Sequence, residues 1–179
     1  MTPLTITFAF VATHNHFVLD RGGKVFKQSA PIIKLPETAT EDDHYALLAY
    51  LNSSTACFWM KQVFYPKATA VGDISIEKGR AEANRYEFAA TGLQALPLPP
   101  WSDVERRAAV ALAREASELA KDVEDLRPAA LAGNPRAPDL ADAERLSDQK
   151  RRRLKVVQED IDWLAYRGFG LVQDWTARG

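Results

Sequence analysis

Side chains that suit contacts with DNA gather in two stretches of the sequence. The first stretch holds Arg21, Lys24, Lys27 and Gln28. Arginine and glutamine make bidentate hydrogen bonds to the edges of guanine and adenine, and lysine binds phosphates. The second stretch interleaves cationic, amide and aromatic side chains, namely Lys61, Tyr65, Lys67, Lys78, Arg80, Asn84 and Arg85. Both stretches are candidate DNA-binding sites, and ordinary solvated loop charge is the competing interpretation of the second.

Metal and catalytic chemistry have much weaker support in the sequence. His14 and His16 are two residues apart, so on a strand both rings would lie on one face and could bind a metal. No third ligand stands beside them, and polar side chains at a strand end are the simpler interpretation. Cys57 is the one cysteine, which excludes an internal disulfide framework. No nucleophile–base set or phosphate-cradling glycine loop is evident, so we predict no catalytic residue, metal site or cofactor here.

The composition is that of an ordinary folded protein and limits how DNA could be bound. The chain has 179 residues, 46% of them apolar and 26% charged, and a formal net charge of -1. Any electrostatic footprint on DNA must therefore be a local patch, or be shared with other parts of a larger protein. The N-terminus lacks the features of a secretory signal, and polar residues interrupt the apolar stretch at 44–65. We expect a cytoplasmic protein without a membrane span.

Residues 1–100 are expected to form a small α/β core. Leu4–Phe10 alternates apolar with small or polar residues, which predicts a half-buried strand. His16–Leu19 and Lys24–Gln28 flank a Gly-Gly loop, which predicts a β-hairpin between them. Ala30–Leu35 predicts a further strand, ended by a proline that lacks the N–H a ladder needs.

A helix is expected after Thr40, whose side chain can cap it and which three acidic residues follow. We predict that the helix continues through Asn52-Ser53-Ser54. Its packed stripe would consist of Leu47, Leu51, Ser54 and Phe58. Residues 62–88 are expected to form an irregular excursion of functional interest, with candidate short strands at Asp73–Glu77 and Tyr86–Ala90.

Residues 101–179 predict an antiparallel helical hairpin, with helices at about 102–126 and 140–167. Ser102 and Glu105 form a capping box at the start of the first helix. Apolar or small residues recur at alternating spacings of four and three in both helices. These residues are Leu112, Ala116, Leu119, Val123 and Leu126 in the first helix, and Ala143, Ser147, Lys150, Leu154, Val157, Ile161 and Leu164 in the second. The whole chain is thus expected to be α+β: a small mixed or antiparallel sheet with a packed helix, followed by the long hairpin.

The densest basic run of the sequence is Lys150–Lys155, within the second hairpin helix. It could bind a phosphate backbone and release counterions. Successive cations on a helix point around most of its circumference, however, and acidic residues lie within pairing distance. A solvated helix face is therefore an equally good interpretation.

Taken together, several segments resemble the C-terminal region of adenine-specific DNA methyltransferases of the phage-growth-limitation and BREX defence type, called PglX. They also share features with TaqI-like specificity domains. The resemblance rests on Phe8–Leu19, Gln28–Pro36, Asn52-Ser53-Ser54, Gly92-Leu93, Leu96–Pro99, Asp162-Trp163 and Tyr166–Leu171. It implies a target-recognition domain that helps to choose the DNA sequence in which S-adenosylmethionine methylates an adenine.

The resemblance also implies that catalysis belongs to another part of the enzyme. The family's Asn-Pro-Pro-aromatic motif, which holds the flipped adenine, does not occur here, since Gly133–Arg136 breaks it at the third position. S-adenosylmethionine is thus expected in a catalytic domain outside this chain. We expect a truncated gene product, a split subunit or an excised piece that does not methylate DNA alone.

Two functions from different classes follow from these observations. The first is a DNA-recognition module that binds double-stranded DNA and works with a methyltransferase catalytic domain. The second is an assembly module whose helical hairpin docks on another subunit of a defence system. The near-neutral charge and the scarcity of large side chains early in the second hairpin helix favour the second function.

Overall fold

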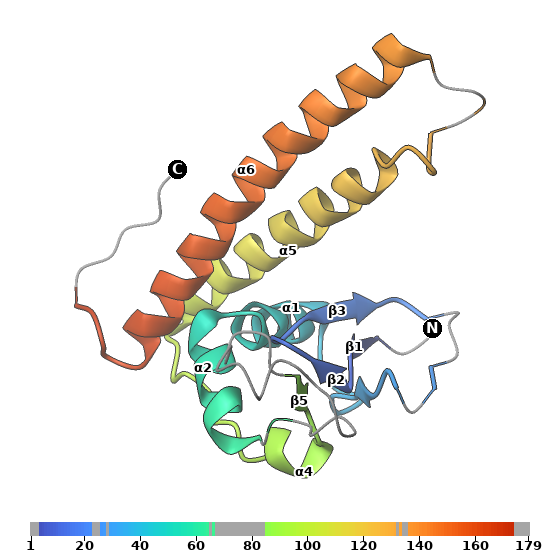
Figure 1. Cartoon of the computed structure of the whole chain (residues 1–179). Coiled ribbons are helices and arrows are strands. Elements are labelled where there is room, and N and C mark those ends of the chain that lie inside the picture. Colours follow the sequence, from blue (N-terminus) through green and yellow to red (C-terminus); the bar gives the residue numbers. More distant parts are fainter. Residues whose placement is uncertain are drawn as a thin grey trace. The chain divides into compact units, whose positions relative to one another are not determined.

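The computed structural model describes residues 4–22, 26–27, 29–64, 66, 85–131, 133 and 136–173. The chain divides into two compact units, Met1–Pro100 and Trp101–Gly179. Short strands and small helices make up the first unit, and two long helices the second (Figure 1). These elements confirm the predicted α+β class. Their bounds are β1 Thr5–Phe8, β2 Val11–Ala12, β3 Phe17–Asp20, β4 Ile32–Ile33, α1 Glu41–Leu51, α2 Ser54–Val63, β5 Tyr86–Glu87, α4 Ala90–Leu93, α5 Asp103–Asp125 and α6 Ala137–Gly168.

The first unit contains a three-stranded antiparallel sheet in the order β3-β1-β4. The central strand β1 pairs Ile6 with Leu19 of β3 on one side and with Ile33 of β4 on the other. Ile6 and Phe8 share one face of β1, and both are buried. The ring of Phe8 packs on that of Phe17, with centroids 4.9 Å apart. A second sheet joins β2 to β5.

The strand β3 has a different partner from the one predicted. We expected His16–Leu19 to pair with Lys24–Gln28, but β3 pairs with β1. In the described part of the second segment, Phe26 and Lys27 are not in a strand, and the Lys27 carbonyl accepts the N–H of Ala30 in a turn. Pairing with β1 buries aromatic rings on one face, an advantage that the local Gly-Gly turn signal does not report.

Two capped helices replace the single helix predicted through residues 52–54. α1 ends at Leu51, and α2 begins at Ser54 after an N-cap at Ser53, whose Oγ accepts the N–H of Ala56 at 3.2 Å. Serine and asparagine favour such caps because their side chains compete for backbone groups in helix interiors. The predicted stripe ends with this break, and Phe58 is exposed.

α1 packs on the sheet and supplies much of the core of the first unit. Thr40 caps its N-terminus as predicted, and Asp43 makes the reciprocal hydrogen bond that completes a capping box, which was not predicted. Leu48, Tyr50 and Leu51 are almost completely buried. Full burial of one such side chain contributes about 1.5–3 kcal/mol to folding.

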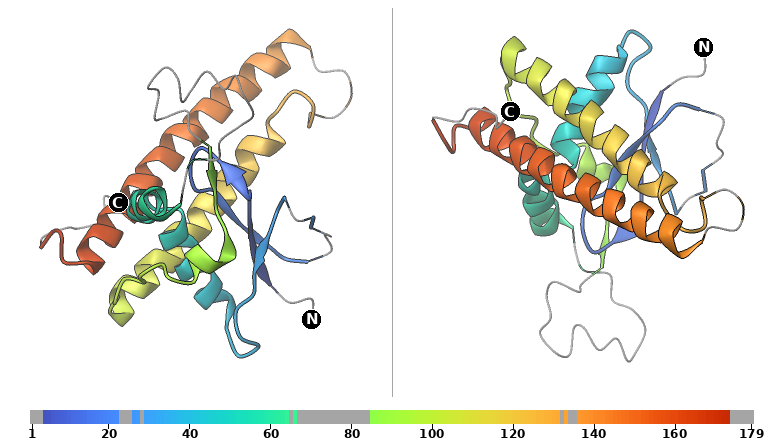
Figure 2. Two further views of the ribbon diagram at one scale, coloured as in Figure 1. Left: turned by 60° about the horizontal axis from the view of Figure 1, so that its bottom comes forward. Right: turned by 90° about the horizontal axis from the view of Figure 1, so that it is seen from above.

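In the second unit, α5 and α6 form an antiparallel pair and lie side by side in both views of Figure 2. Ser102 and Glu105 make the predicted capping box. Trp101 Nε1 donates to the Leu164 carbonyl at 3.3 Å, which ties the start of α5 to the end of α6. An ion pair at 3.1 Å joins Arg167 to Glu105 at the same end.

The inner stripe of α6 is as the spacing predicted, but that of α5 is shifted. None of the seven predicted α6 positions, from Ala143 to Leu164, is exposed. In the first half of α5 the most deeply buried residues are Ala109 and Ala113, whereas the predicted Leu112 and Ala116 are half-buried.

None of the helices in the described part of the chain combines the length and the apolar character of a membrane span.

Candidate nucleic-acid interface

Two asparagine side chains join the start of β3 to the junction between α1 and α2. Asn15 Nδ2 donates to the carbonyls of Leu51 and Ser53, at 2.6 and 3.1 Å. Asn52 Oδ1 accepts the N–H of Phe17, and Asn52 Nδ2 donates to the Phe17 carbonyl, both at 2.9 Å. We name this set of four hydrogen bonds the asparagine clasp. The amide of Asn52 thus pairs with β3 as a neighbouring strand would.

The asparagine clasp holds a short surface segment in place. Asn15 is buried, whereas His14 and His16 on either side of it are exposed. Both histidines lie between β2 and β3 rather than on a strand, so the predicted shared strand face does not exist. The hydroxyl of Thr13 and Nδ1 of His14 are hydrogen-bonded at 2.9 Å. Among the described residues no group of three potential ligands is placed to hold a metal ion.

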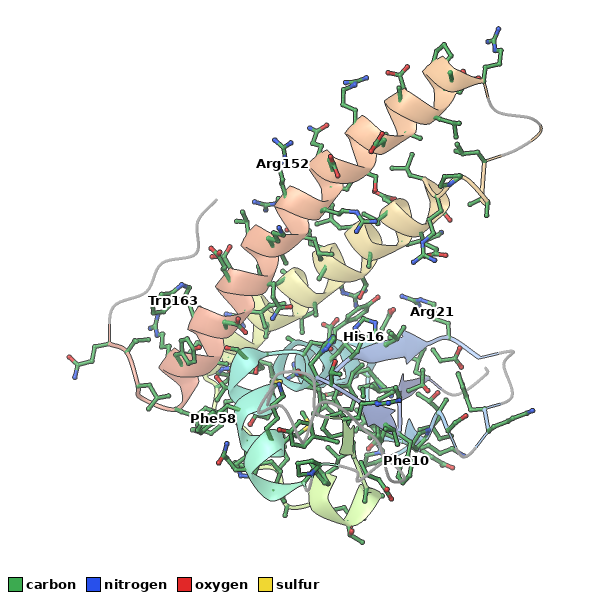
Figure 3. All side chains as sticks on the ribbon, in the orientation of Figure 1. Phe10, His16, Arg21, Phe58, Arg152 and Trp163 are labelled. Atoms are coloured by element: carbon green, nitrogen blue, oxygen red, sulfur yellow. The ribbon has the colours of Figure 1, made fainter. Side chains whose placement is uncertain are left out.

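Arg21 follows β3 (Figure 3), and its guanidinium is already bonded to two side chains within the first unit. It forms an ion pair with Glu41 at the start of α1 and donates to the hydroxyl of Tyr45 at 3.0 Å. The hydrogen bonds to these two side chains raise the pKa of Arg21, and its side chain remains largely exposed. A contact between Arg21 and guanine would have to replace or share the bond to Glu41.

The other members of the first candidate stretch differ in what the structure describes. Lys27 is exposed beside the turn to Ala30. Lys24 and Gln28 lie outside the described residues.

Described residues near the two ends of the second candidate stretch lie next to each other. Pro66 and Tyr86 form an antiparallel bridge, so the two ends of the stretch meet beside β5. The Lys61 ammonium lies 5.7 Å from the centroid of the Tyr86 ring, in a cation–π contact. Arg85 is exposed next to the bridge. Tyr65, Lys67, Lys78, Arg80 and Asn84 lie outside the described residues, as does the predicted strand Asp73–Glu77.

Two aromatic rings pack next to the bridge between Pro66 and Tyr86. The rings of Phe64 and Phe88 meet edge to face at 5.5 Å, and both are buried. A methyl group on Gly92 would overlap the Phe64 ring, so this position accepts only glycine without rearrangement. β5 is shorter than the predicted strand Tyr86–Ala90, because Ala90 already belongs to α4.

Two cations of the basic run Lys150–Lys155 on α6 form ion pairs with α5. Lys150 bonds Asp122 at 2.7 Å, and Arg153 binds both carboxylate oxygens of Glu115 at 2.6 and 3.2 Å. The hydrogen bond to Glu115 is also the main cause of a raised pKa at Arg153. Three further cations of the run are exposed on α6: Arg151, Arg152 and Lys155.

The described glycines do not form a cradle for S-adenosylmethionine. The Gly92 position is closed by Phe64, and Gly170 follows the C-terminus of α6 rather than joining a strand to a helix. Neither of these two described glycines therefore belongs to the strand–loop–helix arrangement that such a cofactor requires.

Sequence reasoning identified the Asn52-Ser53 run as informative but missed Asn15. Asparagine is common in turns, and its pairing with carbonyls that lie 36 and 38 residues away leaves no local signal. Phe58 was also misplaced, since it was expected on a packed stripe.

Comparison with known proteins gives one informative match. The chain is 44% identical over 169 residues to the adenine-specific methyltransferase PglX of Streptomyces coelicolor, and this alignment covers 90% of the chain. It covers only 13% of that relative. The chain is therefore similar, over most of its length, to a small part of a much longer methyltransferase. No protein-family model matches the chain, and no solved structure matches it.

Proposed function

We propose that this chain is the DNA-recognition module of a PglX-type adenine methyltransferase, with methyl transfer carried out by a separate catalytic domain. The observation that carries the proposal is the 44% identity to PglX over nearly the whole chain. In this proposal the module binds double-stranded DNA, and S-adenosylmethionine belongs to the catalytic domain.

The geometry supports two contact regions of different character on the first unit. Arg21 is oriented by Glu41 and Tyr45, which suits a base contact that needs a fixed direction. Lys27, Lys61 and the exposed Arg85 suit phosphates, since a lysine ammonium tolerates a range of positions and a guanidinium can bind a phosphate through two N–H groups.

Fluorescence anisotropy with several duplex sequences at two salt concentrations tests the proposal. We expect Lys61→Ala and Arg85→Ala to weaken binding to all sequences alike, and to reduce the slope of log affinity against log salt by about 1 each. Arg21→Ala should change the preference among sequences. Lys121→Ala, which removes an exposed cation from α5, is the matched control and should leave the affinity unchanged. Negligible, salt-independent binding by the chain, alone and together with its catalytic domain, would refute the proposal.

A second candidate function is assembly through the helical hairpin. Several large apolar side chains of the hairpin unit are exposed: Val104, Leu140, Leu146, Trp163 and Leu171. Such side chains suit a protein contact more than a phosphate backbone. Sedimentation velocity distinguishes the two functions, because a strict monomer that binds duplex DNA leaves this candidate without support.

A further inference from the structure

Phe58 on α2 is the most exposed aromatic ring among the described residues. It is 68% exposed, and the other exposed aromatic side chain among the described residues is Trp163 at 39%. The Trp163 ring rests edge-on against Tyr166, whereas Phe58 has no ring partner among the described residues. Figure 3 shows Phe58 on the side of α2 that faces away from the sheets.

The helix that carries Phe58 is held in a fixed position from its opposite face. Ala56 and Met60 are fully buried, and the N-cap Ser53 belongs to the asparagine clasp. Phe58 therefore projects from a rigid support and does not contribute to the core. A single exposed apolar residue is common in proteins, so the surroundings of Phe58 must indicate whether it has a role.

The surroundings of Phe58 suit a polyanion. Lys61 lies one helical turn away on the neighbouring surface, and its contact with Tyr86 fixes the direction of the charge. An ammonium has three N–H donors, so this contact leaves donors for a phosphate. The exposed Gln62 completes the face. The sequence contains no carboxylate between Asp43 and Asp73, in a chain with 24 acidic residues.

We infer that Phe58 enters the base stack of double-stranded DNA while Lys61 binds an adjacent phosphate. Apolar side chains that project from rigid elements act as wedges between base steps. An enzyme that methylates a base must first extrude it from the duplex, which leaves a gap that a phenyl ring can fill. The inference rests on the proposed function, and it assigns to this module a share in base extrusion as well as in recognition.

The test compares two labelled duplexes that differ only in one central abasic site, which imitates the gap. We expect the full chain to bind the abasic duplex more tightly than the intact one. Phe58→Ala should abolish this preference and weaken binding to the abasic duplex by about 5- to 150-fold, the range found for loss of one base–aromatic stack. Phe58→Tyr, which keeps the ring, should retain the preference. Lys61→Ala should weaken both duplexes by the same factor.

Val104→Ala is the matched control, because Val104 is also 68% exposed but lies on α5, and its loss should leave the affinity for both duplexes unchanged. Circular dichroism should show the same folding for all variants, since Phe58 is outside the core.

Three results would overturn the inference. If wild type binds no duplex, both the proposed function and the insertion of Phe58 into the base stack are refuted. If wild type and Phe58→Ala prefer the abasic duplex equally, the insertion of Phe58 is refuted and the proposed function is not. If Phe58→Ala instead abolishes self-association in sedimentation and leaves DNA binding intact, Phe58 is a protein contact.

Discussion

Asn52→Ala removes both hydrogen bonds that the Asn52 side chain makes to Phe17. The backbone N–H and carbonyl of Phe17 are each 2.9 Å from the Asn52 amide, and Phe17 is only 3% exposed, so water cannot readily replace the lost partners. An unsatisfied buried backbone group costs about 1–3 kcal/mol. Because two such groups lose their partner, we expect the free energy of unfolding of the first unit to fall by about 2–6 kcal/mol, a large part of the ~5–15 kcal/mol typical of a domain.

Asn52→Asp separates the two hydrogen bonds without a change in side-chain volume. An ionised carboxylate still accepts the Phe17 N–H but repels the Phe17 carbonyl, so the variant is destabilised at neutral pH. Protonation restores a donor. The folded state therefore favours the neutral carboxyl group and raises its pKa above the ordinary value of about 3.9. The stability lost relative to wild type should be regained as the pH falls through that raised pKa.

Urea denaturation gives the free energies, and hydrogen exchange resolved by peptide shows where protection is lost. Protection should fall in β3 and α1 and stay unchanged in α6. Gln149→Ala, at an exposed position of α6, is the control. If both Asn52 variants lie within about 0.5 kcal/mol of wild type, as surface substitutions do, the asparagine clasp does not stabilise the fold.

Three further predictions concern individual side chains. The hydrogen bonds from Ser102 hold the pKa of Glu105 below its ordinary value of 4.5, so the stability that Glu105 contributes is present above pH 4.5 and is lost at lower pH. Wild type should therefore lose its advantage over Glu105→Gln as acid is added, measured by thermal unfolding. Burial raises the pKa of Tyr50 from 10.0 to about 12, so its contribution is lost as the pH rises between these values, and Tyr50→Phe should show a smaller alkaline loss of stability. Gly92→Ala forces the buried Phe64 ring to move and should cost about 1–3 kcal/mol in urea denaturation.

Each of these predictions has its own counter-result. If the difference in stability between wild type and Glu105→Gln stays constant from pH 7 to acid, the capping hydrogen bonds of Glu105 are not its cause. Equal alkaline transitions for wild type and Tyr50→Phe would mean that Tyr50 ionises without unfolding. An unchanged stability of Gly92→Ala would show that the packing around the Phe64 ring is loose. Ala95→Gly, at an exposed position just after α4, controls for the change in backbone freedom.

The hairpin helices were predictable because their signals are local. The capping box at Ser102 and the alternating spacing of apolar residues act over four to seven positions and require no knowledge of distant partners. The strand β1 was predictable for the same reason, since alternation marks a half-buried strand wherever its partner lies. The shift of the buried stripe in α5 toward Ala109 and Ala113 was not visible, because alanine carries little hydrophobic signal in a sequence.

Pairings over long sequence distances could not be predicted. At the break between α1 and α2, Asn52 bonds Phe17, which lies 35 residues away. The predicted partner of β3 was wrong because a glycine turn is a local signal, whereas the burial of Phe8 against Phe17 depends on residues that are distant in the sequence. The engagement of Arg21 by Glu41 depends in the same way on packing of α1 beside the sheet. For the candidate site, the sequence thus predicted residue types but not which of them were already bonded within the protein.

The asparagine clasp has a consequence for DNA recognition as well as for stability. A base contact requires donor–acceptor distances of about 2.7–3.2 Å, whereas a phosphate contact by lysine tolerates larger displacements. Arg21 follows the strand that Asn52 fixes, so loosening β3 should disturb base contacts more than phosphate contacts. We therefore expect Asn52→Ala, at a temperature where it is folded, to reduce the ratio of specific to non-specific affinity while leaving non-specific affinity within about twofold of wild type. Anisotropy against a selected target duplex and a scrambled duplex measures that ratio. If binding to the target and to the scrambled duplex weakens equally, the asparagine clasp supports the fold without positioning the side chains that contact bases.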